Sequence, residues 1–257
     1  MIDLTGKTAL ITGGSRGIGA ATAERLAACG ANVALLARSE IQTKVVAERI
    51  GSKAMAIGGD VAVYADVQRA FKAVADHFGS VNIVVNNAGL IDPIARLEDS
   101  DPDSWGQVVD VNIKGVYHCL HAAHPYMKDS GGVIINLSSG AAVNALEGWS
   151  HYCATKAAVL SLTRCAHLEW AGNGIRVVGL SPGTVATDMQ EQIRESGING
   201  VSKMQWSDHI PASDVAQAIA WLTQDEATQY DGRDFSLKTP EGRQEAGLSP
   251  KLTGFPS

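Results

Sequence analysis

Residues Lys7–Gly19 read KTALITGGSRGIG, and this stretch decides the fold. Its first half, Lys7–Thr12, is a short apolar run typical of a strand buried on both faces. Four glycines follow, and the Ala-rich segment Ile18–Cys29 is expected to be a helix that Gly30 ends. A strand, a glycine-rich turn and a helix in this order predict the first unit of a parallel sheet.

The same alternation of strands and helices continues along the chain. Further strands are predicted at Asn32–Ala37, Lys53–Ile57, Asn82–Val85, Gly132–Leu137, Ile175–Leu180 and Asp234–Leu237. Helices are predicted at Glu40–Ile50, Asp66–Phe78, Asp103–Met127, Ser150–Leu160 and Ala212–Gln224. Near-continuous apolar strands that alternate with helices indicate an α/β fold, a single doubly wound domain with a parallel seven-stranded sheet and helices on both faces.

The domain is expected to occupy residues 1–238, because no linker or change of composition interrupts them. Residues 239–257 are rich in Gly, Pro and charge and show no periodicity, so they are expected to form a C-terminal tail. The sequence leaves open whether this tail is disordered or packs on a neighbouring subunit.

The composition excludes several classes of protein. A net charge of −6 and a pI of about 5.6 argue against nucleic-acid binding and against a basic membrane-binding surface. No run approaches the ~20 apolar residues that span a bilayer, and the N-terminus does not resemble a signal peptide. The four cysteines lie singly, without CxxC spacing, which indicates reduced thiols in a cytoplasmic protein.

The glycine-rich turn is the first candidate binding site. Thr12–Gly19 has the spacing Gly-x3-Gly-x-Gly and lies between the first strand and the first helix. Glycines at such a turn let the backbone approach a pyrophosphate, whose charge faces the helix N-terminus. A tight strand–helix connection without a ligand is the simpler alternative. The strand before the turn and the helix after it favour a dinucleotide cofactor.

Tyr152 and Lys156 are the candidate reactive pair. They are four apart in a segment without Gly or Pro, so they lie on the same face of a predicted helix. A phenol has an ordinary pKa near ~10, and a cation beside it favours the phenolate. The pair is therefore a candidate general acid and base, and the simpler alternative is a surface lysine above a core tyrosine.

The combined motifs resemble those of the short-chain dehydrogenase/reductase family, over about Leu4 to Leu222. They are Thr12-Gly-x3-Gly-x-Gly19, Asn86-Asn87-Ala88-Gly89, Asn112, Ser138, Tyr152-x3-Lys156 and Pro182-Gly183. The resemblance implies a Rossmann fold and an oxidoreductase that transfers a hydride between a nicotinamide cofactor and a carbonyl or secondary alcohol. The chain looks similar to 3-oxoacyl-carrier-protein reductases and to diketone and pterin-type carbonyl reductases.

The position after the second strand indicates which nicotinamide cofactor binds. NAD-preferring relatives have an acid there, whereas this chain has Ala37 followed by Arg38 and Ser39. Arg38, together with Arg16 in the glycine turn, is expected to form charge-assisted hydrogen bonds with a 2′-phosphate. We therefore predict NADP(H). The alternative for Arg38 is a solvated loop residue.

The resemblance also implies a set of cofactor-binding residues. In relatives, the positions of Asp60 and Val61 meet the adenine, and those of Val185 and Thr187 hold the nicotinamide carboxamide. A helix cap is a second role open to Asp60. The predicted set is Gly13, Ser15, Arg16, Gly17, Ile18, Gly19, Arg38, Ser39, Asp60, Val61, Asn87, Ala88, Gly89, Tyr152, Lys156, Val185 and Thr187.

Four residues are predicted to be catalytic from the resemblance. Tyr152 would supply the proton, Lys156 would lower the pKa of Tyr152 and hold the nicotinamide ribose, and Ser138 would bond the substrate oxygen. Ser138 is preferred to Ser139 because a strand precedes it directly. Asn112 would hold a water that links Lys156 to solvent. The alternative for Asn112 is a helix-interior amide bonded to backbone.

Histidines and oligomer contacts complete the predictions. His118, His121 and His124 have helical spacing, but no carboxylate accompanies them, so packing or subunit contact is favoured over a metal site.

Relatives are mostly homotetramers or dimers that pair the helices of Asn112 and Tyr152, so a homo-oligomer is expected. The segment Gly232–Leu237 lacks the paired glycines of relatives, which weakens inferences about any contact there.

The physiological substrate stays open, because the segment after Pro182 that covers the cleft in relatives varies most among them. An NADPH-dependent carbonyl reductase is the first hypothesis. The alternatives are an NAD-linked alcohol or sugar dehydrogenase and a catalytically idle protein that senses NADP(H). Cofactor kinetics would separate the two enzymes, and NADPH binding without turnover would favour the sensor.

Overall fold

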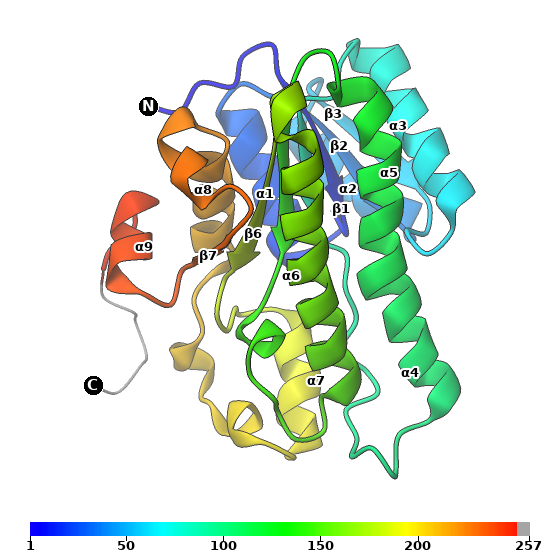
Figure 1. Ribbon diagram of the computed structural model, residues 1–257, viewed down its shortest axis with the longest axis vertical. Helices are drawn as coiled ribbons and strands as arrows, with labels where there is room; N and C mark the ends of the chain where they lie inside the picture. Colours follow the sequence, from blue (N-terminus) through cyan, green and yellow to red (C-terminus); the bar gives the residue numbers. More distant parts are fainter. Residues whose placement is uncertain (251–257) are drawn as a thin grey trace.

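Seven parallel strands form one sheet between two layers of helices in the computed structural model, which describes residues 1–250 (Figure 1). The strands pair in the order β3-β2-β1-β4-β5-β6-β7. Their bounds are β1 Thr8–Thr12, β2 Asn32–Ala37, β3 Ala54–Gly58, β4 Ile83–Asn86, β5 Gly132–Leu137, β6 Ile175–Ser181 and β7 Asp234–Ser236. This arrangement confirms the predicted doubly wound fold.

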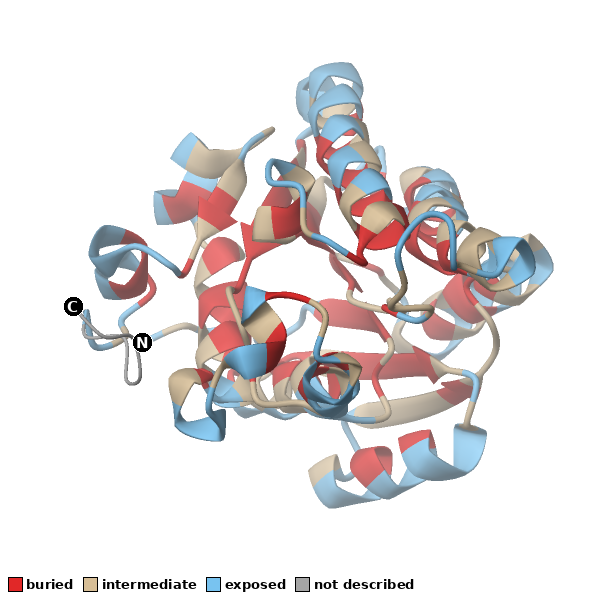
Figure 2. Cartoon of the chain, turned by 90° about the horizontal axis from the view of Figure 1, so that it is seen from below, coloured by how far each residue is buried: buried red, intermediate tan, exposed pale blue. Residues whose placement is uncertain are grey.

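Helices cover both faces of the sheet. Their bounds are α1 Gly17–Ala28, α2 Glu40–Ile50, α3 Tyr64–Phe78, α4 Pro102–Val109, α5 Gly115–Met127, α6 Ser150–Trp170, α7 Asp188–Ser196, α8 Ala212–Leu222 and α9 Pro240–Glu245. One core cluster joins the sheet to α1, α2 and α8, and a second joins it to α3, α5 and α6. Seen from below, buried residues run through the sheet and exposed ones lie on the outer faces of the helices (Figure 2).

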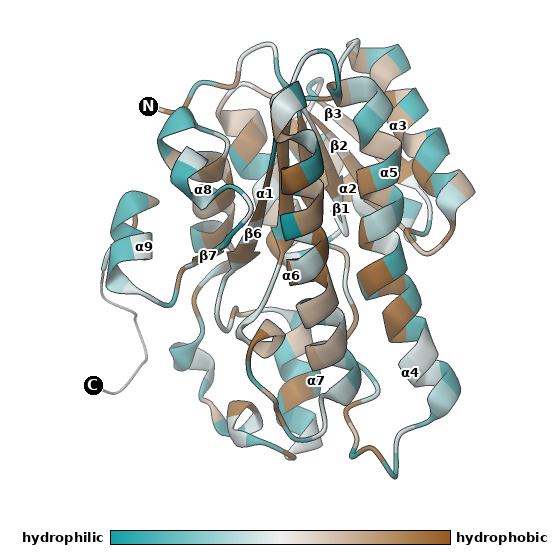
Figure 3. Ribbon diagram, in the orientation of Figure 1, coloured by the Kyte–Doolittle hydropathy of each residue, from teal (hydrophilic) through white to brown (hydrophobic). Residues whose placement is uncertain are grey.

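The strands explain why the sheet lies at the centre of the molecule. Residues such as Leu10, Ile11 and Val84 are fully buried, and each such side chain contributes about 1.5–3 kcal/mol by leaving water. The apolar strands are brown between helices whose outer faces carry much of the teal (Figure 3). The two-sided burial is what the continuous apolar runs in the sequence predicted.

The order of the strands places a crevice at the carboxyl ends of β1 and β4. From β1 the chain continues outward to β2 and β3 on one side. On the other side of β1 it continues outward from β4 to β5, β6 and β7. Ligands of open α/β sheets bind at such a switch point, because the loops that leave the two strands diverge there. The glycine turn (residues 13–19) follows β1, and Asn87 follows β4.

The long helix predicted at Asp103–Met127 is interrupted by one wider turn. Pro102 begins α4, and the side chain of Asp101 caps it by accepting a hydrogen bond from Ser104 N at 2.8 Å. Residues Asp110–Lys114 then form a π-helical segment before α5 continues to Met127. The hydrophobic pattern did not predict this turn, which contains Asn112.

The described part of the tail packs on its own subunit. The side chain of Thr239 caps α9 by accepting from Gly242 N at 3.1 Å, and the buried Arg243 forms an ion pair with Asp214 of α8 at 2.8 Å. Thr239 followed by Pro240 is a helix-start signal, and it marks the first turn of α9. The rest of the predicted tail, 251–257, lies outside the described residues.

No helix within residues 1–250 is both long enough and apolar enough to cross a bilayer.

Candidate active site

The glycine turn has a backbone that only glycine adopts without strain at two positions. Gly13 has a φ of 64° and Gly17 a φ of 52°, both in the left-handed region. Gly19 is required for a different reason, since a Cβ there would lie 2.2 Å from the carbonyl oxygen of Gly13. The first turn of α1 therefore approaches the loop closely, with its unpaired N–H groups at the crevice.

Asn87 and Thr12 hold the turn in place. Asn87 Nδ2 donates to the carbonyl oxygens of Thr12 and Gly13, at 2.9 and 3.2 Å. Thr12 Oγ1 in turn accepts from the backbone N–H groups of Asn87 and Ala88, both at 3.0 Å. These four bonds connect the ends of β1 and β4, so the loop is fixed before any ligand arrives.

A cavity of about 660 Å³ extends from the glycine turn to Tyr152. Most of the predicted site residues line it, namely Gly13, Ser15, Arg16, Gly17, Ile18, Arg38, Ser39, Asp60, Val61, Asn87, Ala88, Gly89, Ser138, Tyr152, Lys156 and Thr187. Three do not line it. Gly19 lies beneath the turn, Val185 is buried and forms a β-bridge with Ile210, and Asn112 is buried.

Asn112 holds the loop after β4 against α6 by hydrogen bonds. Its Oδ1 accepts from Leu90 N at 2.8 Å, while its Nδ2 donates to Leu90 O at 2.9 Å and to Thr155 Oγ1 of α6 at 3.2 Å. This is the backbone-bonded amide that the sequence analysis gave as the alternative. Asn112 therefore ties Leu90 to α6, and its amide contacts neither Lys156 nor the cavity in the described chain.

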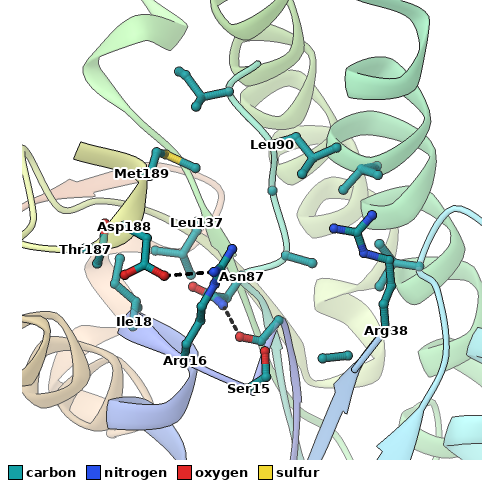
Figure 4. Close-up of a pocket in the computed structure, with 18 of the residues that line it drawn as sticks. Ser15, Arg16, Ile18, Arg38, Asn87, Leu90, Leu137, Thr187, Asp188 and Met189 are labelled. Atoms are coloured by element: carbon teal, nitrogen blue, oxygen red, sulfur yellow. Dashed lines mark hydrogen bonds and ion pairs between the residues drawn. The ribbon is translucent and has the colours of Figure 1, made fainter. Parts of the chain in front are cut away.

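Arg16 and Arg38 lie on opposite sides of the cavity mouth (Figure 4). Arg16 Nη1 forms an ion pair with Asp188 Oδ2 at 2.8 Å, at the start of α7. The exposed Arg38 forms no such ion pair in the part of the chain that the structure describes. Arg38 is therefore the guanidinium available to a ligand, and it follows Ala37 at the end of β2.

Asp60 and Ser39 line the adjoining wall and also shape the local backbone. Asp60 Oδ1 accepts from Ala62 N at 2.9 Å, and Ser39 Oγ caps α2 by accepting from Gln42 N at 3.4 Å. Asp60 is not the helix cap that was offered as its second role, because Val63 is the N-cap of α3 and no side chain caps that helix. Asp60 closes a local turn instead, and both Asp60 and Ser39 line the cavity.

Lys156 and Tyr152 are both buried at the inner end of the cavity. Lys156 Nζ donates to the carbonyl oxygen of Leu137 at 2.7 Å and lies 5.4 Å from the centre of the Tyr152 ring. Burial lowers the pKa of Lys156 to about 8. Burial raises the pKa of Tyr152 to about 12, against the smaller lowering effect of the Ser139 hydroxyl.

The electrostatics of Tyr152 differ from the sequence-based expectation. Lys156 was expected to lower the pKa of Tyr152, but the ammonium is bonded to Leu137 and lies over the ring. Loss of water around the phenol therefore has the larger effect. Tyr152 consequently holds its proton at neutral pH when the cleft contains no ligand.

The structure brings Ser139, and not Ser138, to the Tyr152 hydroxyl. The hydroxyl of Ser139 interacts with that of Tyr152 and also accepts from Ala141 N at 3.2 Å. Ser138 Oγ is buried without a hydrogen-bond partner and lies on the side of Asp234. The expectation chose Ser138 because a strand precedes it directly. β5 does end at Leu137 as predicted, but Ser138 lies on the side of Asp234 and Ser139 on the side of Tyr152.

The substrate side of the cavity contains residues outside the predicted set of site residues. These are Leu90, Ile91, Asp92, Gln107, Met189 and Gln192. Two of them, Met189 and Gln192, lie in the segment after Pro182 that was expected to cover the cleft. Asp92 Oδ2 accepts from Gln192 Nε2 at 2.8 Å, so the loop after β4 touches α7 across the cleft. The two residues are 100 positions apart, and no local pattern connects them.

The three histidines of α5 make protein contacts outside the cavity. His118 Nδ1 lies 2.8 Å from Val61 O, and His121 Nδ1 lies 2.8 Å from Tyr64 Oη. His124 packs on Trp170, with ring centres 5.2 Å apart. These contacts join α5 to α3 and to α6.

Comparison with known proteins assigns the family. A family model described as short chain dehydrogenase matches residues 7–197. The chain belongs to the short-chain dehydrogenase family. This assignment confirms the resemblance read from the motifs, and such enzymes act on CH–OH or C=O groups with a nicotinamide cofactor.

Individual short-chain dehydrogenases show what this chain is similar to. An uncharacterised oxidoreductase of Staphylococcus epidermidis is 38% identical over 74% of this chain and 83% of its own. The 3-oxoacyl-acyl-carrier-protein reductase of Staphylococcus aureus is 36% identical over 88% of this chain and 94% of its own. The crystal structure of 3-ketoacyl-acyl-carrier-protein reductase of Brucella melitensis with NADH has a TM-score of 0.83 and 32% identity, and covers 91% of this chain and 98% of its own.

Proposed function

We propose that the protein is an NADP(H)-dependent ketoreductase, which reduces a carbonyl to a secondary alcohol. One observation supports this most strongly. The buried Tyr152 and Lys156 face the same cavity as the glycine turn, so a proton donor and a dinucleotide would meet there. The relatives named as 3-oxoacyl-acyl-carrier-protein reductases support the same reaction class.

The residues around the glycine turn fit a dinucleotide. At Gly13, Gly17 and Gly19 a side chain would meet strain or neighbouring atoms, so the turn keeps its backbone open to a pyrophosphate. Arg38 supports NADP(H) over NAD(H), because its guanidinium is available to a 2′-phosphate and Ala37 places no acid there. Arg16, which the sequence analysis paired with Arg38, is engaged by Asp188.

The mechanism assigns one task to each residue of the inner cavity. When bound, the reduced nicotinamide supplies the hydride. Tyr152 donates its proton to the developing alkoxide, since its hydroxyl is protonated at neutral pH. We assign to Ser139, in place of Ser138, the second hydrogen bond to the substrate oxygen. Lys156, when protonated, stabilises the phenolate that Tyr152 leaves and is positioned to hold the nicotinamide ribose.

Loss of NADPH absorbance with a panel of 3-oxoacyl thioesters, diketones and sugars tests the proposal. Tyr152→Phe is expected to lower kcat at least about a hundredfold, because the proton donor is lost, while NADPH binding measured by fluorescence stays near the parent value. Tyr117→Phe, at an exposed tyrosine of α5, is the matched control. Residual activity of Tyr152→Phe within tenfold of the parent would contradict the assignment.

The two adjacent serines provide a second test. Ser139→Ala is expected to lower kcat by about ten- to a hundredfold, because a donor to the developing oxyanion is removed. Ser138→Ala is expected to have the smaller effect, since its hydroxyl lies on the side of Asp234. A larger loss for Ser138→Ala would restore the assignment made from the sequence.

We also propose a cytoplasmic homo-oligomer, a dimer or tetramer formed through α5 and α6. Tyr126 of α5 and Leu168 of α6 expose apolar surface, which supports such a contact. Light scattering of the purified protein measures the mass of the assembly, and a monomer at micromolar concentration would contradict the proposal.

A further inference from the structure

Asp234, at the start of β7, belongs to a row of paired strand positions on the face of the sheet that helix α6 covers. The strand register pairs Asn86 with Asn136, Asn136 with Gly179, and Gly179 with Asp234. Residues paired across parallel strands share one face of the sheet. Asn136 Nδ2 donates to Thr163 Oγ1 of α6 at 2.9 Å, so this is the face that α6 covers.

Gly179 lets the Asp234 carboxyl group lean over β6. A Cβ at position 179 would lie 2.7 Å from Asp234 Oδ1, so a larger residue would push the carboxyl group away. Ser181 Oγ donates to Asp234 Oδ2 at 2.6 Å and fixes the group in this position. Asp234 Oδ1 is buried without a partner, as is Ser138 Oγ.

Lys156 and Asp234 lie on either side of Ser138. The ammonium of Lys156 is bonded to the carbonyl of Leu137, the residue before Ser138. The Ser138 side chain lies on the side of the Asp234 carboxyl group, and neither Ser138 Oγ nor Asp234 Oδ1 has a hydrogen-bond partner in the described chain. No ion pair joins Lys156 to a carboxylate within residues 1–250, so any effect of Asp234 on Lys156 acts at longer range, between a buried ammonium and a half-buried carboxyl group. Coulomb interactions between such groups are stronger than in water, because water screens them only in part.

Burial and the surrounding charges have opposite effects on the pKa values of Lys156 and Asp234. Burial lowers the pKa of Lys156, and Asp234 is the charged group that opposes this. Burial raises the pKa of Asp234, while Ser181, Ser138, Lys156 and Arg164 lower it. The groups around Lys156 are thus Tyr152 of α6, the carbonyl of Leu137 of β5 and, at longer range, Asp234 of β7, while Arg164 of α6 is exposed.

We propose that Asp234 is a positioning residue whose half-buried carboxylate, held by Ser181, keeps Lys156 protonated at the working pH. This inference rests on the proposed function, because that function gives Lys156 its catalytic role. No proton is transferred to or from Asp234 in this role. Without the carboxylate, Lys156 loses its proton at a lower pH, and the phenolate of Tyr152 loses its stabilising cation.

The first test measures Lys156 directly in the ligand-free protein. The pKa of Lys156 is followed by the NMR shift of its 13Cε, assigned with Lys156→Arg. Asp234→Asn keeps the shape of the side chain and an acceptor for Ser181 but removes the charge. It is expected to shift the titration of Lys156 down by about one pH unit, the size of effect that one nearby charge produces. The exposed Asp225→Asn is the control and is expected to leave the titration unchanged.

The second test is the pH profile of carbonyl reduction. Activity that needs protonated Lys156 is lost as the pH rises through the pKa of Lys156. Asp234→Asn is therefore expected to move this alkaline limb to lower pH, again by about one pH unit. The kcat on the acid side is expected to stay within about threefold of the parent. A merely structural residue would lower activity at every pH without moving the limb.

The outcomes distinguish this inference from the proposed function. An unmoved Lys156 titration in folded Asp234→Asn overturns the inference, whatever the activity. A parent protein that reduces no carbonyl overturns the proposed function, while the NMR titration still decides the role of Asp234. If Asp234→Asn does not fold, Asp234→Ala decides, because it removes the charge without placing an amide beside the buried Ser138 hydroxyl. It is expected to lower the Lys156 titration by a similar amount, and no shift overturns the inference.

Discussion

The two halves of the cavity are held together by different kinds of contact. On the cofactor side, Asn87 bonds to the backbone of Thr12 and Gly13, and glycines admit the close approach of α1. On the substrate side, α7 is joined to the opposite wall by exposed side chains, through Arg16–Asp188 and Asp92–Gln192. The first half is therefore rigid and the second adjustable, because exposed pairs open at little cost while a backbone close approach does not.

The largest effect is expected where a side chain is added to the rigid half. Gly19→Ala places a Cβ 2.2 Å from Gly13 O, so the turn must shift away from the pyrophosphate site. Overpacking of this kind costs about 1–3 kcal/mol, and the Kd for NADPH is expected to rise by up to about a hundredfold. Fluorescence titration measures the Kd, and thermal unfolding is expected to show a lower Tm.

The control for this change is Gly106→Ala in α4. A Cβ at Gly106 meets nothing within 4 Å, and alanine favours a helix, so binding is expected to be unchanged and Tm equal or higher. An NADPH affinity of Gly19→Ala within threefold of the parent would show that the turn is more adjustable than the contacts indicate.

An intermediate effect is expected at the mouth of the cavity, where Arg38 lies. Arg38→Ala removes the guanidinium that we assign to the 2′-phosphate, and kcat/KM for NADPH is expected to fall by about ten- to a hundredfold while that for NADH is unchanged. Arg16→Ala is expected to cost less, because Arg16 is bound to Asp188. Steady-state kinetics with both cofactors measure the ratio, and Arg49→Ala on the far end of α2 is the control. Equal losses with NADH and NADPH would refute the cofactor assignment.

The smallest effect is expected where the adjustable half is loosened. Asp188→Asn breaks the exposed contact with Arg16, and the KM for the carbonyl substrate is expected to change by less than about threefold. Raising the salt concentration is expected to shrink the difference, because salt screens exposed charges. Asp76→Asn, in the exposed Lys72–Asp76 pair of α3, is the matched control. A tenfold change in KM, unaffected by salt, would show that α7 is part of the rigid half.

The same division explains what could be predicted from the sequence. The strands and the glycine turn depend on residue types at short spacing, and their order agrees with the prediction. The helix α7 and its contacts were not predicted, because Arg16 and Asp188 are 172 positions apart and each is an ordinary exposed charge. The helix α9 was missed although Thr239-Pro240 signals a helix start.

Within the inner cavity, residue identities were easier to predict than their environments. Tyr152 and Lys156 line the cavity together, as their spacing indicated. The effect of burial on Tyr152 was not predictable, since it depends on surrounding residues such as Trp149, whose ring packs edge-on against Tyr152 at 5.5 Å. The end of β5 at Leu137 was predicted correctly, but which of Ser138 and Ser139 faces Tyr152 depends on the turn that follows, where Ser139 Oγ accepts from Ala141 N.

The π-helical segment Asp110–Lys114 has a consequence for the whole of α5. An added residue in one turn advances the following helix by about 100° relative to an uninterrupted α-helix. Cys119, Leu120 and Ala123 face the sheet because of this extra winding. Shortening the chain by one residue here would straighten the helix and swing those three side chains out of the interior, so the local length of the chain, as much as its composition, sets which face of α5 is buried.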